Sequence, residues 1–349
     1  MSFPVPRIVP VDPNWMAAAE RHQNDLTKPP GSLGRLESIA NRCAAIFGSL
    51  TPPVDAARIV VFAADHGVAE EGVSAYPREV TAQMVLNYLN GGAAINALAQ
   101  ANGIDLVVVD AGVATPLPDA PGLIRHHIGD GTRNFTREPA MTEAQVDEAL
   151  EAGMAEAEAA IADGYHLLGC GEMGIANTTA AAAIAALLSG RPPEEVTGRG
   201  TGVDDASFRR KCSAIGRGLA LHGPNFRGPV DLLRRLGGFE IAEMCGFFIG
   251  AAARRRPVVV DGFIATAAAA LAECIAPSAG NYMFAAHRSV EPGHSTLLRI
   301  IGQEPILDLG MRLGEGTGAA LAMQVIRSAV AAFTGMATFS SAGVSNKSA

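Results

Sequence analysis

The sequence predicts an α/β protein with a doubly wound, mostly parallel sheet and a small helical domain formed by the two terminal segments. In the middle of the chain, short apolar runs rich in β-branched residues alternate with Ala-rich stretches of helical period. Asp, Gly or Pro bounds each apolar run, as in strands that are buried on both faces of a parallel sheet. Both ends of the chain carry helical patterns without strands, so they are expected to form a separate helical unit.

Five apolar runs are the predicted strands, and they cover residues 58–64, 105–110, 166–169, 257–261 and 282–285. In a doubly wound sheet the ligand lies beyond the carboxyl ends of the strands. The loops that follow these runs are therefore where we expect the functional side chains.

Helical periodicity predicts six helices between or after these strands, at residues 77–89, 143–163, 178–189, 206–221, 265–274 and 317–333. Two more are predicted at residues 14–24 and 33–47, with the stiff segment Lys28-Pro-Pro-Gly-Ser-Leu-Gly between them. We therefore expect residues 1–50 and 315–349 to form the helical domain and residues 51–314 the α/β domain. The polar segment 340–349 is expected to be a frayed tail.

Charge and hydropathy exclude two classes of partner. The chain has 27 Lys and Arg against 35 Asp and Glu, a net charge of −8, and no basic block. Sequence-independent binding of nucleic acid needs clustered Lys and Arg, so we expect no nucleic-acid partner. The longest apolar runs, such as residues 180–188, are about nine residues long, whereas a bilayer span needs about twenty. The N-terminus has no apolar signal core, so we expect a cytoplasmic protein with no membrane partner.

The cysteines predict neither disulfides nor a zinc site. They are odd in number, far apart and never in a C-x-x-C pair. We expect free, mostly buried thiols at all five positions, because free cysteine packs like a small apolar residue. These positions are Cys43, Cys170, Cys212, Cys245 and Cys274.

The segment Gly169-Cys-Gly-Glu-Met-Gly174 matches G-x-G-x-x-G, after a predicted strand and before a predicted helix. In a dinucleotide site such glycines admit a pyrophosphate to a helix N-terminus, and an acidic residue follows about twenty positions later. Here that region, residues 190–197, is broken by prolines, so a single phosphate held near Asn177 is favoured. Glu172 would repel a phosphate and better suits a sugar hydroxyl or a cationic heterocycle. A strand–helix turn with no ligand remains the alternative.

A second glycine cluster, residues 198–202, precedes the predicted helix that carries Lys211. The loop and the lysine form a possible second anion clamp. The alternative is a helix capped by an aspartate, with a solvated lysine on it.

Asp65 and His66 end the first predicted strand, which makes a metal or acid–base role conceivable. No H-x-x-x-H or carboxylate spacing supports a metal, so we predict none. We expect a structural hydrogen bond between the two side chains instead. Further along, Tyr76 opens an amphipathic helix containing Gln83 and Met84, which predicts either an apolar pocket wall or an ordinary core face.

Glu315 lies between Gly314 and Gly316 at the start of the last predicted helix. Glycine is a poor helix former, and a glutamate at a helix N-terminus needs no glycines beside it. The arrangement is explained if the backbone must let a flat ligand approach the carboxylate. A charged first residue in a turn is the structural alternative.

Taken together, the motifs resemble the nicotinate-nucleotide–dimethylbenzimidazole phosphoribosyltransferase family over about residues 26–336. The resemblance implies transfer of a phosphoribosyl group from nicotinate mononucleotide to 5,6-dimethylbenzimidazole, giving α-ribazole 5′-phosphate and nicotinate in cobalamin biosynthesis. It also implies a Rossmann-like large domain, a homodimer, and neither metal nor cofactor. The motifs that carry it are K-P-P-G-S-L-G-R-L-E from Lys28, A-D-H-G-V from Ala64, E-G-V from Glu71, G-E-M-G-I-A-N-T-T from Gly171, G-G-F from Gly237, V-D-G-F from Val260 and R-L-G-E-G from Arg312.

The chemistry of this reaction needs one general base and no general acid. The pyridinium leaving group departs neutral, whereas the incoming benzimidazole must lose a ring proton. The resemblance implies Glu315 as the base and Glu172 as a second active-site acid near the ribose. It implies phosphate contacts from Gly174, Asn177, Lys211 and Ser289, and an acceptor pocket of Tyr76, Met84 and Leu313, with Gln83 as the alternative to Met84.

Two other functions remain open at this point. One is an NAD-dependent oxidoreductase that uses the loop 169–174, which the missing ribose-binding acid argues against. The other is a nucleotide-sensing partner protein without catalysis, which leaves the glycine-flanked Glu315 unexplained. The range of acceptor bases is not predicted.

Overall fold

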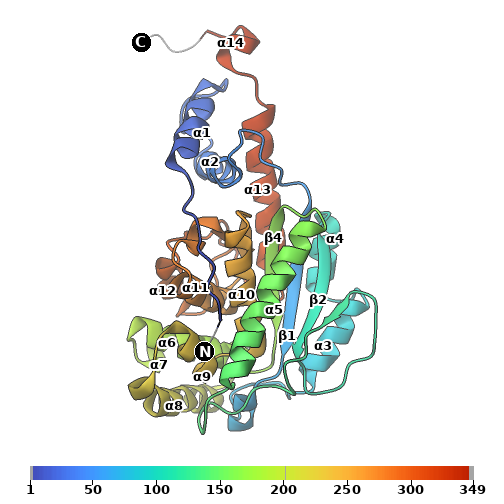
Figure 1. The fold of residues 1–349 in the computed structure, drawn as a ribbon, viewed down its shortest axis with the longest axis vertical. Coiled ribbons are helices and arrows are strands. Elements are labelled where there is room, and N and C mark those ends of the chain that lie inside the picture. Colours follow the sequence, from blue (N-terminus) through green and yellow to red (C-terminus); the bar gives the residue numbers. More distant parts are fainter. Residues whose placement is uncertain (1–2, 201, 346–349) are drawn as a thin grey trace.

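The computed structural model describes residues 3–200 and 202–345 and shows an α/β fold around one parallel sheet (Figure 1). The strand order is β3-β2-β1-β4-β5-β6, and every pair in the sheet is parallel. The chain thus winds outward from the centre in both directions, as predicted, and the direction changes between β1 and β4. The strands are β1 (Ala57–Ala64), β2 (Asp105–Gly112), β3 (Leu123–Arg125), β4 (Leu167–Met173), β5 (Val258–Val260) and β6 (Met283–Ala285).

The observed sheet departs most from the prediction at β4, β6 and β3. β4 continues to Met173, so Gly171 and Glu172 lie inside the strand and not in the loop after it. Tyr282 closes a short 3₁₀ turn (η3, Ala279–Tyr282), and β6 begins one residue later. β3 was not predicted, because this three-residue edge strand is partly exposed and has no continuous apolar run.

Helices cover both faces of the sheet (Figure 1). One face carries α10 (Phe239–Ala253), which crosses β1, β2, β4 and β5, with α5 (Glu143–Ala162) packed on it. The sequence did not predict α10, because all residues from Phe239 to Ala252 are buried and no polar face marks the helical period. The other face carries α3 (Val80–Leu89), α4 (Ala94–Ala101) and α13 (Thr317–Gly335).

The remaining helices surround the β4–β5–β6 half of the sheet or lie near the termini. They are α1 (Pro13–Asp25), α2 (Arg35–Phe47), α6 (Asn177–Ser189), α7 (Pro193–Val196), α8 (Asp205–His222), α9 (Pro229–Leu236), α11 (Phe263–Ile275), α12 (His294–Ile300) and α14 (Phe339–Ala342). The segment 340–349 was expected to be a frayed tail. This expectation is wrong for residues 340–342, which belong to α14, and residues 346–349 lie outside the described part of the chain.

The two ends of the chain lie together, with α1 and α2 beside α13 (Figure 1). Leu26 and Thr338 form an antiparallel bridge, and His22 Nε2 lies 2.9 Å from the Phe333 carbonyl oxygen. Among the described residues, α13 is the one helix long and apolar enough to cross a membrane, but half of its apolar window is buried. It contacts α2, α4 and β4, so it is a core helix of this fold.

Candidate active site

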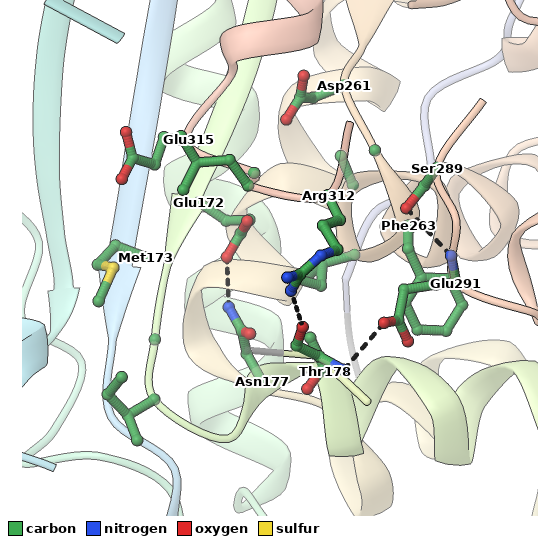
Figure 2. A pocket seen from close by; sticks show the side chains of 18 of the residues that line it. Glu172, Met173, Asn177, Thr178, Asp261, Phe263, Ser289, Glu291, Arg312 and Glu315 are labelled. Atoms are coloured by element: carbon green, nitrogen blue, oxygen red, sulfur yellow. Dashed lines mark hydrogen bonds between the residues drawn. The ribbon is translucent and has the colours of Figure 1, made fainter. Parts of the chain in front are cut away.

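A cavity of about 380 Å³ opens at the carboxyl ends of β4, β5 and β6 (Figure 2). Its walls come from residues 172–178 after β4, 261–265 after β5 and 287–291 after β6, and from the turn 312–315 before α13. α3 closes one side through Val80 and Met84. The cavity thus lies beside the change of winding direction, where doubly wound sheets bind their ligands.

The structure brings almost all predicted site residues to this one cavity. Lys211 is the exception: it lines a smaller cavity of about 30 Å³ that shares Gly174, Asn177 and Thr178 with the larger one. Gln83 is exposed and lines neither cavity, so Met84 is the residue of the two that faces the site. The predicted residues on the large cavity are Tyr76, Met84, Glu172, Gly174, Asn177, Ser289, Leu313 and Glu315.

Glu315 stands in a left-handed turn that the surrounding structure holds in place. Its φ is 64°, between Gly314 at 84° and Gly316 at 89°. Residues other than glycine rarely adopt this backbone conformation, and such strain persists only where neighbouring groups fix the backbone. Asp261, directly after β5, supplies that support, because its carboxylate accepts from the Gly316 amide at 3.1 Å and the Ala319 amide at 2.9 Å.

The glycines in β4 make room for this turn. A Cβ on Gly171 would overlap the carbonyl oxygen of Glu315, and one on Gly169 would lie 2.5 Å from the Met323 methyl group. Both glycines therefore admit the start of α13 against the strand. This close packing, and not a pyrophosphate, explains the first two glycines of the G-x-G-x-x-G pattern.

Gly171→Ala is expected to displace the turn that carries Glu315. Its Cβ would meet backbone atoms, which cannot rotate away, so kcat should fall about tenfold and unfolding free energy by about 1–3 kcal/mol. Activity assays and denaturant unfolding measure the two effects. Gly216→Ala on α8 is the matched control, because its Cβ would meet nothing within 4 Å. If both variants show the same kcat and the same unfolding free energy, the close approach of β4 and the turn does not contribute to function.

Two of the buried carboxylates that line the cavity are the predicted site residues Glu172 and Glu315, and both have raised pKa values. Burial raises the pKa of Glu172 to about 8; the Asn177 amide, which donates to Oε2, opposes this rise, and nearby carboxylates add to it (Figure 2). Burial also raises the pKa of Glu315, although the Ile95 backbone and the Tyr88 hydroxyl act in the opposite direction. Glu315 Oε2 accepts no hydrogen bond from any described residue. This oxygen is buried and keeps a lone pair that no described residue uses.

The opposite wall contains a peptide that is held from both sides. Glu291 Oε1 accepts from the Gly200 amide at 2.9 Å, and Arg312 Nη1 donates to the Gly200 carbonyl at 2.9 Å (Figure 2). Behind it, Lys211 Nζ donates to Thr178 Oγ1 at 2.8 Å. Burial lowers the pKa of Lys211 to about 8, while the charge of Glu291 opposes this change. Because Lys211 is only 1% exposed, the alternative of a solvated lysine is wrong.

Asp65 and His66 are buried but do not line the cavity. The predicted hydrogen bond between them is wrong, because each side chain has another partner. His66 Nε2 bonds Glu240 Oε1 on α10 at 2.6 Å, and Asp65 Oδ2 accepts from the Ala114 amide at 2.9 Å. Both residues therefore brace the strand ends against neighbouring segments.

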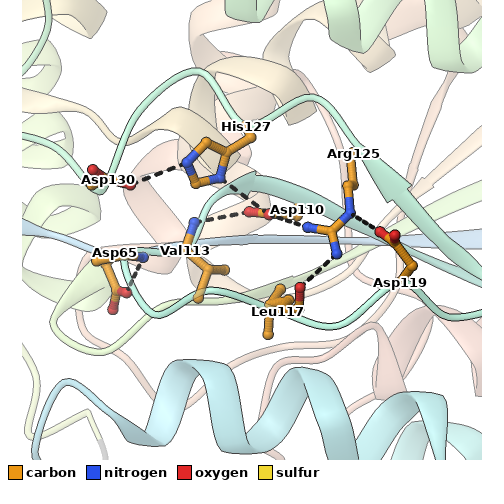
Figure 3. A network of polar contacts seen from close by, with 9 residues as sticks. Asp65, Asp110, Val113, Leu117, Asp119, Arg125, His127 and Asp130 are labelled. Atoms are coloured by element: carbon orange, nitrogen blue, oxygen red, sulfur yellow. Dashed lines mark hydrogen bonds and ion pairs between the residues drawn. The ribbon is translucent and has the colours of Figure 1, made fainter.

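A related network braces the end of β2 (Figure 3). Asp110 accepts from the Val113 amide at 2.9 Å and lies 3.2 Å from His127 Nδ1. Arg125 links the same aspartate to Asp119. In the described part of the chain, no group of three or more His, Cys, Asp or Glu side chains is arranged to hold a metal ion.

Sequence reasoning did not single out several residues of this site. Asp261, His287, Glu291 and Arg312 all line the cavity. Asp261 and Arg312 belong to motifs that carry the resemblance, but only the fold shows that Asp261 caps α13. Glu291 has no motif of its own beyond its place two residues after Ser289.

Comparison with known proteins gives one consistent family. A family model described as "Phosphoribosyltransferase" matches residues 8–344. A nicotinate-nucleotide–dimethylbenzimidazole phosphoribosyltransferase from Chloroflexus aggregans is 54% identical over 340 residues, which cover 97% of this chain and 96% of the relative. The enzyme of that name from Geobacter metallireducens is 53% identical, with 97% and 96% covered.

A solved structure with the same enzyme name, from Thermus thermophilus, has the same fold. It is 47% identical with a TM-score of 0.91, and the match covers 96% of this chain and all of that one. None of these comparisons supports the alternative of an NAD-dependent oxidoreductase.

Proposed function

The chain belongs to the phosphoribosyltransferase family of these relatives, and we propose how its cavity performs their reaction. The protein transfers the phosphoribosyl group of nicotinate mononucleotide to 5,6-dimethylbenzimidazole, giving α-ribazole 5′-phosphate and nicotinate in cobalamin biosynthesis. The observation that carries the mechanism is Glu315, a buried carboxylate in the cavity wall whose Oε2 accepts no hydrogen bond from any described residue. A single base of this kind suffices, because the pyridinium leaving group departs neutral.

Glu315 takes the ring proton of the benzimidazole as its other nitrogen attacks the anomeric carbon. The raised pKa of Glu315 lies closer to neutral pH, and its carboxylate is therefore a stronger base than that of an exposed glutamate. Glu172 lies near the ribose in this arrangement. With a pKa of about 8 it is mostly neutral in the free enzyme, and a cationic pyridinium beside it favours the ionised form. The negative charge then stabilises the positive charge that develops on the ribose.

The donor phosphate lies at the start of α6. Gly174 brings the backbone close, the positive end of the α6 dipole faces the phosphate, and Ser289 and Lys211 complete the subsite. The acceptor lies against Tyr76, Met84 and Leu313. Tyr76 and Leu313 are 53% and 56% exposed, so they offer an apolar surface for a flat ring. The reaction as written needs neither a metal nor a cofactor.

The proposal extends to assembly and location. We assign a homodimer, supported by the exposed apolar residues at the cavity mouth, which a second subunit would cover. We assign the cytoplasm, supported by four buried, unpaired cysteines, which suit a reducing compartment. The helical unit is assigned residues 1–50 and 315–349, and the α/β unit residues 51–314, supported by the packing of α1 and α2 beside α13.

The test is direct synthesis. The purified protein is incubated with nicotinate mononucleotide and dimethylbenzimidazole, and the coupled nucleotide and released nicotinate are followed by mass. Both should appear in equal amounts, and neither should form without the acceptor base. Reduction of NAD with a small alcohol substrate serves as the control for the oxidoreductase alternative. Failure to form the coupled nucleotide would refute the proposed reaction.

A further inference from the structure

A buried chain of hydrogen bonds runs from the cavity wall into the core. The Ser289 amide donates to His294 Nδ1 at 2.9 Å, and His294 Nε2 lies 2.9 Å from Thr266 Oγ1. Thr266 Oγ1 in turn donates to the Gly262 carbonyl at 2.7 Å. All three side chains are buried, with Thr266 and His294 at 0% and 1% exposure. This series of hydrogen bonds therefore joins the loop after β6 to the first turn of α11.

The direction of each bond follows from its donors. A backbone amide can only donate, so His294 Nδ1 must carry a lone pair. The Thr266 hydroxyl gives its proton to Gly262, so its oxygen accepts the proton of His294 Nε2. Only the neutral imidazole with its proton on Nε2 satisfies both ends.

The surroundings keep this ring neutral. Burial, together with smaller contributions from the neighbouring His287 and Arg288, lowers the pKa of His294 to about 3. The His287 ring lies 6.5 Å from the His294 ring between centroids. The tautomer thus stays the same throughout the physiological pH range.

One end of the chain carries a functional hydroxyl. Ser289 lines the cavity, and its oxygen accepts from the Glu291 amide at 3.4 Å. Its own proton therefore remains available to a ligand oxygen. The other end, Gly262, follows Asp261, whose carboxylate caps α13 beside Glu315. The Gly262 end of the hydrogen-bond series is therefore a fixed part of the site.

We propose that His294 is a positioning residue for the donor phosphate: its Nε2–H tautomer ties the Ser289 amide to the first turn of α11 and so aims the Ser289 hydroxyl into the cavity. The inference rests on the proposed function, because the phosphate is the ligand of that subsite. His294 does not touch the substrate in this role. The competing explanation is a histidine that only fills the core.

Two conservative replacements separate the two bonds. His294→Asn keeps an acceptor near the position of Nδ1 and loses the bond to Thr266, whereas His294→Gln extends its amide toward Thr266 and loses the acceptor for Ser289. His294→Ala loses both. On α11, Thr266→Val removes the hydroxyl that bonds His294, whereas Thr266→Ser keeps it. His222→Ala is the matched control, because His222 is also buried and bonds a backbone carbonyl, that of Phe135, outside the cavity.

The readout is the KM of each substrate, measured separately from kcat. His294→Ala and His294→Gln should raise the KM for nicotinate mononucleotide about tenfold, the effect of losing one buried hydrogen bond, with the benzimidazole KM nearly unchanged. Thr266→Ser should stay within about threefold of wild type. His294→Asn and Thr266→Val, which lose only the bond between His294 and α11, should lie between these groups, and His222→Ala should change neither KM.

Equal KM values for the Asn and Gln variants, or a parallel loss for both substrates, would overturn the positioning role. ¹⁵N-histidine NMR of the wild-type protein provides a measurement that needs no variant to fold. An Nε2–H ring that does not titrate between pH 5 and 8 supports the inference, and titration near pH 6.5 contradicts it. A wild-type protein that forms no coupled nucleotide would refute the proposed function itself, which is a different result.

Discussion

Glu315→Gln should lower kcat by about 10²–10⁴, the usual contribution of a general base. Glutamine keeps the shape of the side chain and one acceptor oxygen, but it cannot take a proton at neutral pH. Because the amide oxygen still accepts the benzimidazole N–H, the KM of both substrates should change little. Loss of kcat at constant KM is the signature of an interaction made in the transition state.

The pH profile gives the same residue a second test. A base works in its ionised form, so kcat should fall as the pH drops through the pKa of Glu315. Burial raises that pKa above its ordinary value, and this acid limb should therefore lie nearer to neutrality than for an exposed glutamate. The Gln variant should lack the limb. Measurements need saturating dimethylbenzimidazole, so that kcat and not binding is followed.

Glu151→Gln, on the exposed side of α5, is the control for loss of one carboxylate. It should match wild type in both rate and profile. A Glu315→Gln enzyme within about threefold of wild type, with its acid limb intact, would show that Glu315 only orients the acceptor. Glu172, the other buried carboxylate of the cavity, would then be the candidate base.

The sheet could be predicted from the sequence because its strands are short apolar runs with sharp ends. β1 and β2 were predicted within two residues of their observed bounds, and their carboxyl ends directed attention to the correct edge of the sheet. α10 could not be predicted in the same way. Its side chains are buried on all sides, and periodicity carries no information where there is no polar face.

The site was predictable where a local pattern is unusual, and unpredictable where partners meet only through the fold. Glu315 was found because glycines on both sides of a glutamate make no structural sense in a helix. Its support, Asp261, lies 54 residues earlier in the chain, and nothing in the V-D-G-F segment indicates that it caps α13. Gly171 was assigned to a loop because its actual neighbour, the Glu315 backbone, lies 144 residues later in the chain.

Lys211→Ala should raise the KM for nicotinate mononucleotide about ten- to a hundredfold and leave the benzimidazole KM nearly unchanged. A charge-assisted hydrogen bond contributes about 1.5–3 kcal/mol, which corresponds to this range. The lysine reaches the site from behind Gly200, since a Cβ there would lie 3.3 Å from Nζ. Two of its contacts, Thr178 Oγ1 and the Gly198 carbonyl, point the ammonium group toward the start of α6.

The pH dependence separates a phosphate contact from a supporting role of Lys211. Its pKa of about 8 means that the ammonium is charged at pH 7 and loses its proton as the pH rises through 8. The ratio kcat/KM for the mononucleotide reports groups of the free enzyme, so it should fall above pH 8 in wild type and lose that limb in Lys211→Ala. Arg209→Ala, which removes an exposed charge from the same helix, should keep the wild-type profile. The contrary result is that Lys211→Ala weakens both substrates equally and leaves the alkaline limb unchanged. That result would mean that the lysine only holds the Gly198–Gly200 segment in place, and the phosphate would then depend on Ser289 and the N-terminus of α6.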